Sequence, residues 1–144
     1  MFKTNSIAGR LAVSKTLGFV VGLLAVLSLP LIPVETTLEF KIGVILLVML
    51  MSVTIGLFGI FTHHPMFPKW KMPWWFRGSL VGVTYMLMLV LLAKDAIEPF
   101  MSINIVVSMG LTSPYWALID GAIIGAFIGY VTTRLCGEGD LPIK

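Results

Sequence analysis

Cysteine and charge are both scarce in this sequence. The 144 residues include one cysteine, Cys136, so no disulfide can form within the chain. Charged residues make up 12% of the chain, against about 25% in soluble domains. The two histidines, His63 and His64, are adjacent, and adjacent side chains point in different directions, which makes a poor chelate. We therefore expect no disulfide, no metal site and no cofactor.

Sequence motifs of catalysis are missing as well. The chain has no nucleophile elbow, phosphate-binding loop, HExxH zinc motif or paired acid–base carboxylates. Its basic residues flank apolar stretches, an arrangement that suits anionic lipid headgroups better than nucleic acid. These observations predict a protein that is not an enzyme and does not bind nucleic acid.

Apolar residues, by contrast, are abundant. They account for 58% of the chain, and the mean hydropathy is +0.99. Soluble domains are only about 45–50% apolar. This excess predicts an integral membrane protein made of one transmembrane domain, with the lipid bilayer as its surroundings.

Four apolar stretches are long enough to cross a bilayer, which takes about 20 helical residues. A fifth segment, before the last span, is partly apolar and too short to cross, so we interpret it as an interfacial or re-entrant helix. The predicted spans are 17–34, 40–61, 74–93 and 115–133, and the interfacial segment is 98–112. The sequence thus predicts an all-α fold in which four transmembrane helices form a bundle.

Capping and turn residues mark the predicted helix starts. The stretch 36–39, with the sequence TTLE, fits a capping box before the second span. Pro73 suits the first turn of the third span. Ser113 and Pro114 together combine a hydroxyl cap with a first-turn proline, and so predict the start of the last helix.

Basic residues gather on one side of the predicted membrane. If the N-terminus is inside, only Lys41 and Lys94 of the ten basic residues lie outside. The positive-inside rule then predicts that both termini are cytoplasmic, in a cytoplasmic (inner) membrane. The basic residues predicted inside are Lys3, Arg10, Lys15, Lys69, Lys71, Arg77, Arg134 and Lys144.

Small residues recur at every fourth position in each span, and most extensively in the last. Such a row lets another helix approach closely, which is how helices gain contact energy in lipid. The last row packs either against other spans of this chain or against another subunit or protein. The rows are Ala117, Gly121, Gly125 and Gly129 in the last span, Gly18 and Gly22 in the first, Ser52 and Gly56 in the second, and Gly78 and Gly82 in the third.

Asp120 lies beside the row of the last span, close to its outer end. A carboxylate within a span is costly and needs a partner or a function. One interpretation is an ion pair with Lys94 or Lys41, which are predicted at the same level. Another is a carboxylate that binds a proton or cation along a transport path, and a third is a contact with a partner subunit.

Tryptophan and basic side chains cluster between the second and third spans. Indole rings prefer the headgroup region, and lysine attracts anionic lipid. We expect this segment to contact anionic headgroups on the cytoplasmic side. Its residues are Lys69, Trp70, Lys71, Trp74, Trp75 and Arg77.

Three functions fit these features. The leading hypothesis is a non-catalytic structural or interaction subunit of a membrane assembly, oligomeric through its small-residue helix faces, with a second copy or another membrane subunit as partner. The second is a minimal ion- or proton-coupled transporter or channel that uses Asp120. The third is a lipid-binding membrane protein.

Overall fold

In the computed structural model, the regular structure of the described residues is helical. The structure describes residues 6–32, 34–61, 63, 69 and 72–137, and no strand occurs among them. Four helices are long and apolar enough to cross a membrane. The prediction of an all-α integral membrane protein with four spanning helices is confirmed in these terms.

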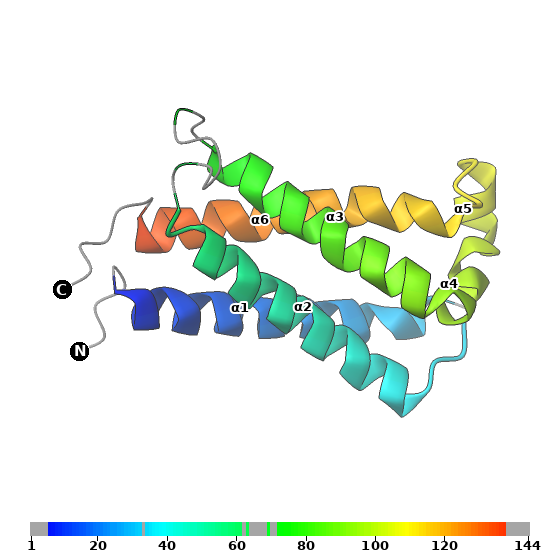
Figure 1. Cartoon of the computed structure of the whole chain (residues 1–144). Helices are drawn as coiled ribbons and strands as arrows, with labels where there is room; N and C mark the ends of the chain where they lie inside the picture. Colours follow the sequence, from blue (N-terminus) through cyan, green and yellow to red (C-terminus); the bar gives the residue numbers. More distant parts are fainter. Residues whose placement is uncertain (1–5, 33, 62, 64–68, 70–71, 138–144) are drawn as a thin grey trace.

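The four long helices lie side by side, and α1 begins at the same end of the molecule at which α6 finishes (Figure 1). We call this end the terminal end and the opposite end the far end. The helices are α1 (Ile7–Ser28), α2 (Leu38–Phe58), α3 (Trp74–Leu92) and α6 (Ala117–Cys136). Short 3₁₀ turns, Leu29–Leu31 and Pro114–Trp116, follow α1 and precede α6.

Two short helices occupy most of the segment between α3 and α6. They are α4 (Lys94–Met101) and α5 (Asn104–Ser108), and both lie at the far end (Figure 1). Neither is long enough to cross a bilayer. α4 is tied to the start of α2 by stacking of Phe100 on Phe40, with ring centroids 5.6 Å apart.

Side-chain caps fix the starts of α1 and α2. The Ser6 hydroxyl accepts a hydrogen bond from the Gly9 amide at 3.0 Å, so the helix begins ten residues before the predicted apolar span. Thr37 caps α2 by accepting from the Phe40 amide at 3.2 Å. The cap therefore lies one residue later than the predicted box requires, and Glu39 falls within the first turn of the helix.

Prolines mark the other two starts without a side-chain cap. Pro73 is the residue just before α3, one position earlier than a first-turn proline. Ser113 precedes the 3₁₀ turn, and Pro114 is its first residue, as expected, but the Ser113 side chain makes no capping hydrogen bond. The fixed φ of proline suits both of these positions.

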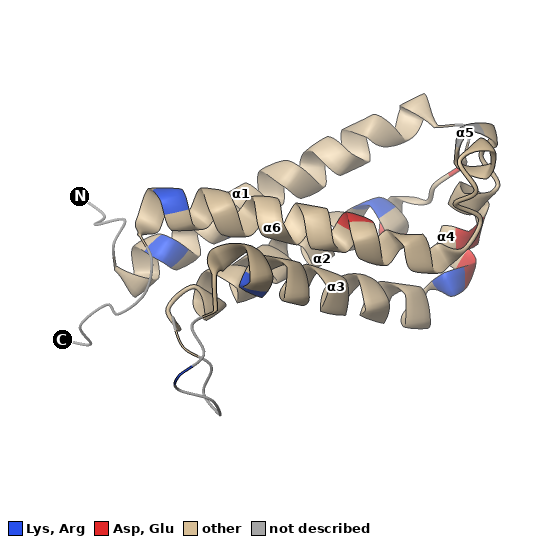
Figure 2. Ribbon diagram, turned by 90° about the horizontal axis from the view of Figure 1, so that it is seen from above, with Lys and Arg blue, Asp and Glu red and all other residues tan. Residues whose placement is uncertain are grey.

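Charge is distributed unevenly between the two ends. Basic segments of α1, α3 and α6 lie toward the terminal end, whereas both signs occur toward the far end (Figure 2). The described acidic residues belong to the far half of the molecule and are Glu35, Glu39, Asp95, Glu98 and Asp120. An apolar core connects the four long helices between these ends. Its buried residues are Val48, Met51 and Ile55 of α2, Val81 of α3 and Ile128 of α6, and Leu17 and Val21 of α1 pack against them.

Candidate functional site

The helices associate as two close pairs, α1 with α2 and α3 with α6. Contact between the pairs is far less extensive than contact within them. Each pair therefore has one face in contact with its partner helix and other faces that stay open.

Glycine backbones meet directly between α3 and α6. A Cβ added at Gly125 would lie 2.9 Å from the carbonyl carbon of Gly78 and 3.0 Å from the Cα of Gly82. A Cβ at Gly121 would lie 3.0 Å from the carbonyl carbon of Gly82. These separations are too short for a side chain, so the central part of the α6 row is occupied by α3 of the same chain.

The ends of the α6 row are less tightly covered. A Cβ at Gly129 would lie 3.0 Å from the Trp74 carbonyl oxygen and 3.4 Å from the Cα of Gly78. Ala117, at the far end of the row, begins α6 and is partly exposed. The row is thus an internal contact along most of its length.

The small residues of α1 pack against α2 in a different way. A Cβ at Gly18 would lie 2.8 Å from the Cα of Met49, and one at Gly22 would lie 3.0 Å from the Cα of Ile45. Here glycine on one helix faces residues with larger side chains on the other. The predicted rows of the first three spans are therefore also used inside the chain.

Buried hydroxyl groups connect the helices through backbone carbonyls. Ser52 of α2 donates to the Ser14 carbonyl of α1 at 2.6 Å, and Ser14 donates to the Arg10 carbonyl at 2.8 Å. Between the pairs, the hydroxyls of Thr54 in α2 and Tyr85 in α3 are 2.9 Å apart. The Ser52 and Thr54–Tyr85 contacts are interhelical, whereas the Ser14 bond lies within α1, and none of these groups lines a polar cavity in the described part of the chain.

Two arginines are buried at the terminal end. Arg10 of α1 is 2% exposed and donates to the carbonyl of Gly137, just after α6. Arg77 of α3 is 3% exposed and donates to the carbonyl of Phe61, which lies after α2. Each guanidinium therefore reaches from its own pair to the end of the second helix of the other pair.

Helix C-termini make suitable partners for these cations. The two acceptor carbonyls lie just past the ends of α6 and α2, where the helix dipole adds partial negative charge. Gly59, at the end of α2, leaves room for Arg10, because a Cβ there would collide with the guanidinium group. Through these hydrogen bonds the two arginines connect the two helix pairs at the terminal end.

The burial of Arg77 differs from its expected place at the lipid headgroups. It lies one residue before Gly78, whose contact with α6 turns this part of α3 toward the interior. Lys69 and Trp75 are exposed, as headgroup contacts require, and Trp74 is partly buried against Tyr130 of α6 with ring centroids 5.2 Å apart. The remaining predicted headgroup residues, Trp70 and Lys71, lie outside the described residues.

The predicted partners of Asp120 are not joined to it. Asp120 is exposed, and no ion pair connects it to Lys41 or Lys94 in the part of the chain that the structure describes. Its position beside Gly121 explains this exposure, because Gly121 faces α3 and the preceding residue points away. A polar path at Asp120 remains a prediction without a structural feature in its favour.

No cluster of three or more potential metal ligands occurs within the described ranges. His63 is described and His64 is not. The chain matches no protein-family model, no curated protein and no solved structure. The choice among the functions therefore depends on the surfaces that the two helix pairs leave open.

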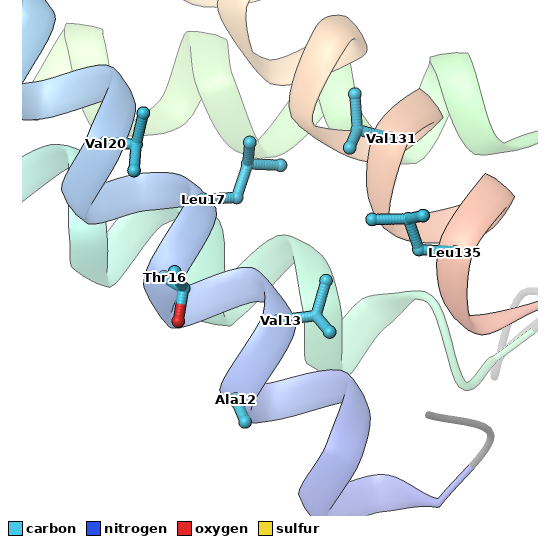
Figure 3. A pocket seen from close by; sticks show the side chains of 7 residues that line it. All are labelled: Ala12, Val13, Thr16, Leu17, Val20, Val131 and Leu135. Carbon is cyan, nitrogen blue, oxygen red and sulfur yellow. The ribbon is translucent and has the colours of Figure 1, made fainter. Parts of the chain in front are cut away.

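A groove between α1 and α6 is one of these surfaces, and its lining is almost wholly apolar. Its volume is about 440 Å³, and it opens to the side of the molecule. Figure 3 shows α1 side chains along one wall and α6 side chains along the other. The lining residues are Ala12, Val13, Thr16, Leu17 and Val20 of α1, with Val131 and Leu135 of α6.

Proposed function

We propose that this protein is a non-catalytic interaction subunit of a membrane assembly, and that it assembles through the groove between α1 and α6. In this proposal the four long helices form a transmembrane bundle in the cytoplasmic membrane. The terminal end is cytoplasmic, and α4 and α5 lie at the opposite interface. The observation that carries the proposal is an apolar groove at the seam between the two helix pairs.

The small-residue rows are not available for assembly. Gly121 and Gly125 face α3, while Gly18 and Gly22 face α2. A partner would have to separate a helix pair to reach them. Assembly through an already folded chain therefore favours a surface outside the pairs.

α1 is the helix most open to its surroundings. In the most apolar part of the α1 span 17% of the residues are buried, whereas the share in the α6 span is 33%. A spanning helix with so little cover gains contact energy when another helix packs against it. The groove places this open helix beside α6, so that a docked helix would touch both.

A second copy of the chain is the occupant that we propose. Two copies in one membrane share the same orientation, so a twofold axis along the membrane normal would bring α1 of each copy toward the groove of the other. The two α1 and two α6 helices would then form one four-helix arrangement. Because such a contact uses the same residues on both sides, one substitution changes the interface twice.

Self-association in lipid tests this proposal. Ala12→Trp places a large side chain in the groove, and Leu91→Trp, on an exposed part of α3 outside it, is the matched control. We expect Ala12→Trp to weaken dimerisation by at least about tenfold, as measured by energy transfer between labelled copies in bilayers. Leu91→Trp should leave it unchanged.

Two results would contradict the proposal. One is a chain that remains monomeric in bilayers at all protein-to-lipid ratios. The other is dimerisation that Ala12→Trp and Leu91→Trp affect equally. Unchanged circular dichroism and melting of both variants would show that the comparison concerns the groove and not the fold.

The proposed orientation has its own test. Cys136 is buried and makes a poor reporter of accessibility, so new cysteines are introduced into a Cys136→Ser chain. Lys69 and Glu98 are exposed near opposite ends. We expect Glu98→Cys to react with an impermeant maleimide in intact cells, and Lys69→Cys only after permeabilisation. The reverse pattern would overturn the orientation.

A further inference from the structure

The outward face of α6 changes character along its length. Four of its exposed residues, from Ile123 to Arg134, recur at spacings of four, three and four, which places these four on one face of the helix. Ile123, Phe127 and Tyr130 are 63%, 53% and 46% exposed, and Arg134 is exposed at the terminal end. Along this face an aliphatic side chain is followed by a phenyl ring, a phenol and a guanidinium. A phospholipid presents matching groups in the same order, from its acyl chain through the glycerol region to the phosphate.

Aromatic side chains from α3 extend this face at the level of Tyr130. The Trp74 and Tyr130 rings lie 5.2 Å apart with 55° between their planes. Trp75 follows Trp74 and is 53% exposed. Tryptophan and tyrosine are typical of the region between acyl chains and headgroups, so this cluster marks the depth of the glycerol backbone.

The charge above this cluster is positive. The structure describes charged residues in the first turns of α1 and α3 and in the last turns of α6. All of these described residues are basic. Arg10 and Arg77 are buried against helix-end carbonyls. Arg134 is exposed and shares the face of Tyr130, and a guanidinium binds phosphate through two parallel hydrogen bonds.

We propose that this face of α3 and α6 binds an anionic phospholipid. One acyl chain lies along Ile123 and Phe127, the glycerol region lies against Trp74 and Tyr130, and Arg134 binds the phosphate. The site is separate from the α1–α6 groove, because Val131 and Leu135 line that groove from a neighbouring row of α6. Its occupation therefore does not depend on the proposed function.

Quenching of tryptophan fluorescence by brominated lipid tests the site. Trp70→Phe and Trp116→Phe together leave Trp74 and Trp75 as the reporters. In bilayers of brominated phosphatidylglycerol mixed into phosphatidylcholine, we expect stronger quenching than with brominated phosphatidylcholine at the same fraction. Arg134→Gln should weaken the apparent affinity for phosphatidylglycerol by about fivefold, the effect expected of one basic residue near an anionic headgroup.

Lys15→Gln is the matched control, because Lys15 is an exposed basic residue near the same end but on α1. It should leave the quenching unchanged. An equal loss in both variants would show a general surface charge and overturn the site, as would equal quenching by the two brominated lipids. Relief of quenching by excess inorganic phosphate would assign the site to a free anion and overturn the lipid assignment.

A variant that keeps the charge separates binding from folding. Arg134→Lys retains a cation but loses the planar fork of the guanidinium, so we expect an affinity between those of the unsubstituted chain and Arg134→Gln. If Arg134→Gln and Arg134→Lys both bind phosphatidylglycerol as tightly as the unsubstituted chain and melt at its temperature, Arg134 does not bind the phosphate and the proposal fails.

Discussion

The two helix pairs reach the same closeness by different means. Between α3 and α6, glycines on both helices bring backbone against backbone, as at Gly82 and Gly121. Between α1 and α2, Gly18 of α1 faces the Met49 backbone and the Ser52 side chain of α2. Gly56 of α2 in turn faces the Ser14 side chain of α1. At Gly125 each of the nearest atoms belongs to the backbone of α3, whereas Gly18 and Gly56 also meet serine side chains.

The two pairs also differ in their polar contacts. In the α1–α2 pair, the Ser52 hydroxyl is fully buried and reaches the Ser14 carbonyl at 2.6 Å. In the α3–α6 pair, the Ser79 hydroxyl reaches the Ala122 carbonyl at 3.1 Å and is only partly buried. The α1–α2 pair thus combines packing with a buried hydrogen bond, while the α3–α6 pair relies more heavily on backbone packing.

The largest effect is expected where neither helix can yield. Gly125→Leu would place a whole side chain where a Cβ alone lies 2.9 Å from the Gly78 carbonyl carbon. Because overpacking costs about 1–3 kcal/mol even where side chains can shift, we expect separation of α3 from α6 and loss of the folded monomer. The readouts are circular dichroism and monodispersity in mild detergent.

Gly43→Leu is the control for this substitution, because nothing lies within 4 Å of a Cβ at Gly43. It should leave the protein folded. If Gly125→Leu instead produced a stable monomer that only failed to self-associate, the α6 row would be an intermolecular contact, and the internal pairing described above would be wrong.

The next largest effect concerns the arginines that join the pairs. Arg10→Gln and Arg77→Gln each remove a hydrogen bond between a cation and a helix-end carbonyl. Hydrogen bonds to charged groups contribute about 1.5–3 kcal/mol, so we expect each variant to lower the free energy of unfolding by about 2 kcal/mol. Titration with a denaturing detergent measures this change.

Arg134→Gln, at an exposed arginine of the same end, should change the free energy of unfolding by much less. Equal destabilisation by all three substitutions would mean that net positive charge, and not these contacts, stabilises the terminal end.

These arginines show where the sequence was and was not sufficient. Hydropathy predicted the four spanning helices, since length and apolar content depend on the chain alone. The sequence predicts that Arg10 and Arg77 are membrane-surface residues, because they flank apolar stretches. A signal for Arg10 was nevertheless present: Arg10, Ser14, Gly18 and Gly22 follow one another at four-residue spacing, which places the arginine on the packed face of α1.

The pairing of the helices could not be read from the sequence. Small-residue rows occur in all four spans, so the α6 row had three candidate partners within the chain as well as another subunit. Asp120 illustrates the same limit, since its orientation follows from the packing of Gly121 against α3. Both answers depend on contacts between distant segments, which spacing along one helix does not specify.

A smaller effect is expected from a methyl group in the α1–α2 pair. A Cβ at Gly22 would lie 3.0 Å from the Cα of Ile45 and 3.5 Å from the Cβ of Val48. A shift of a few tenths of an ångström would relieve this contact, so we expect Gly22→Ala to destabilise the protein by about 1 kcal/mol. Gly82→Ala, in the α3–α6 pair, should cost clearly more, and equal losses in denaturant titration would remove the difference between the pairs.

The smallest effect is expected from the hydroxyl contact between the pairs. Thr54 and Tyr85 are 2.9 Å apart through their hydroxyl oxygens, but Thr54 also donates toward its own helix at the Leu50 carbonyl, 3.0 Å away. Interhelical hydrogen bonds in membranes average about 0.6 kcal/mol, so Thr54→Val and Tyr85→Phe should each cost about that much. In a double-mutant cycle the combined loss should fall short of the sum, because either substitution alone breaks the contact. Fully additive losses would show that the two hydroxyls are not coupled. The arginines at the terminal end would then be the main polar connection between the pairs.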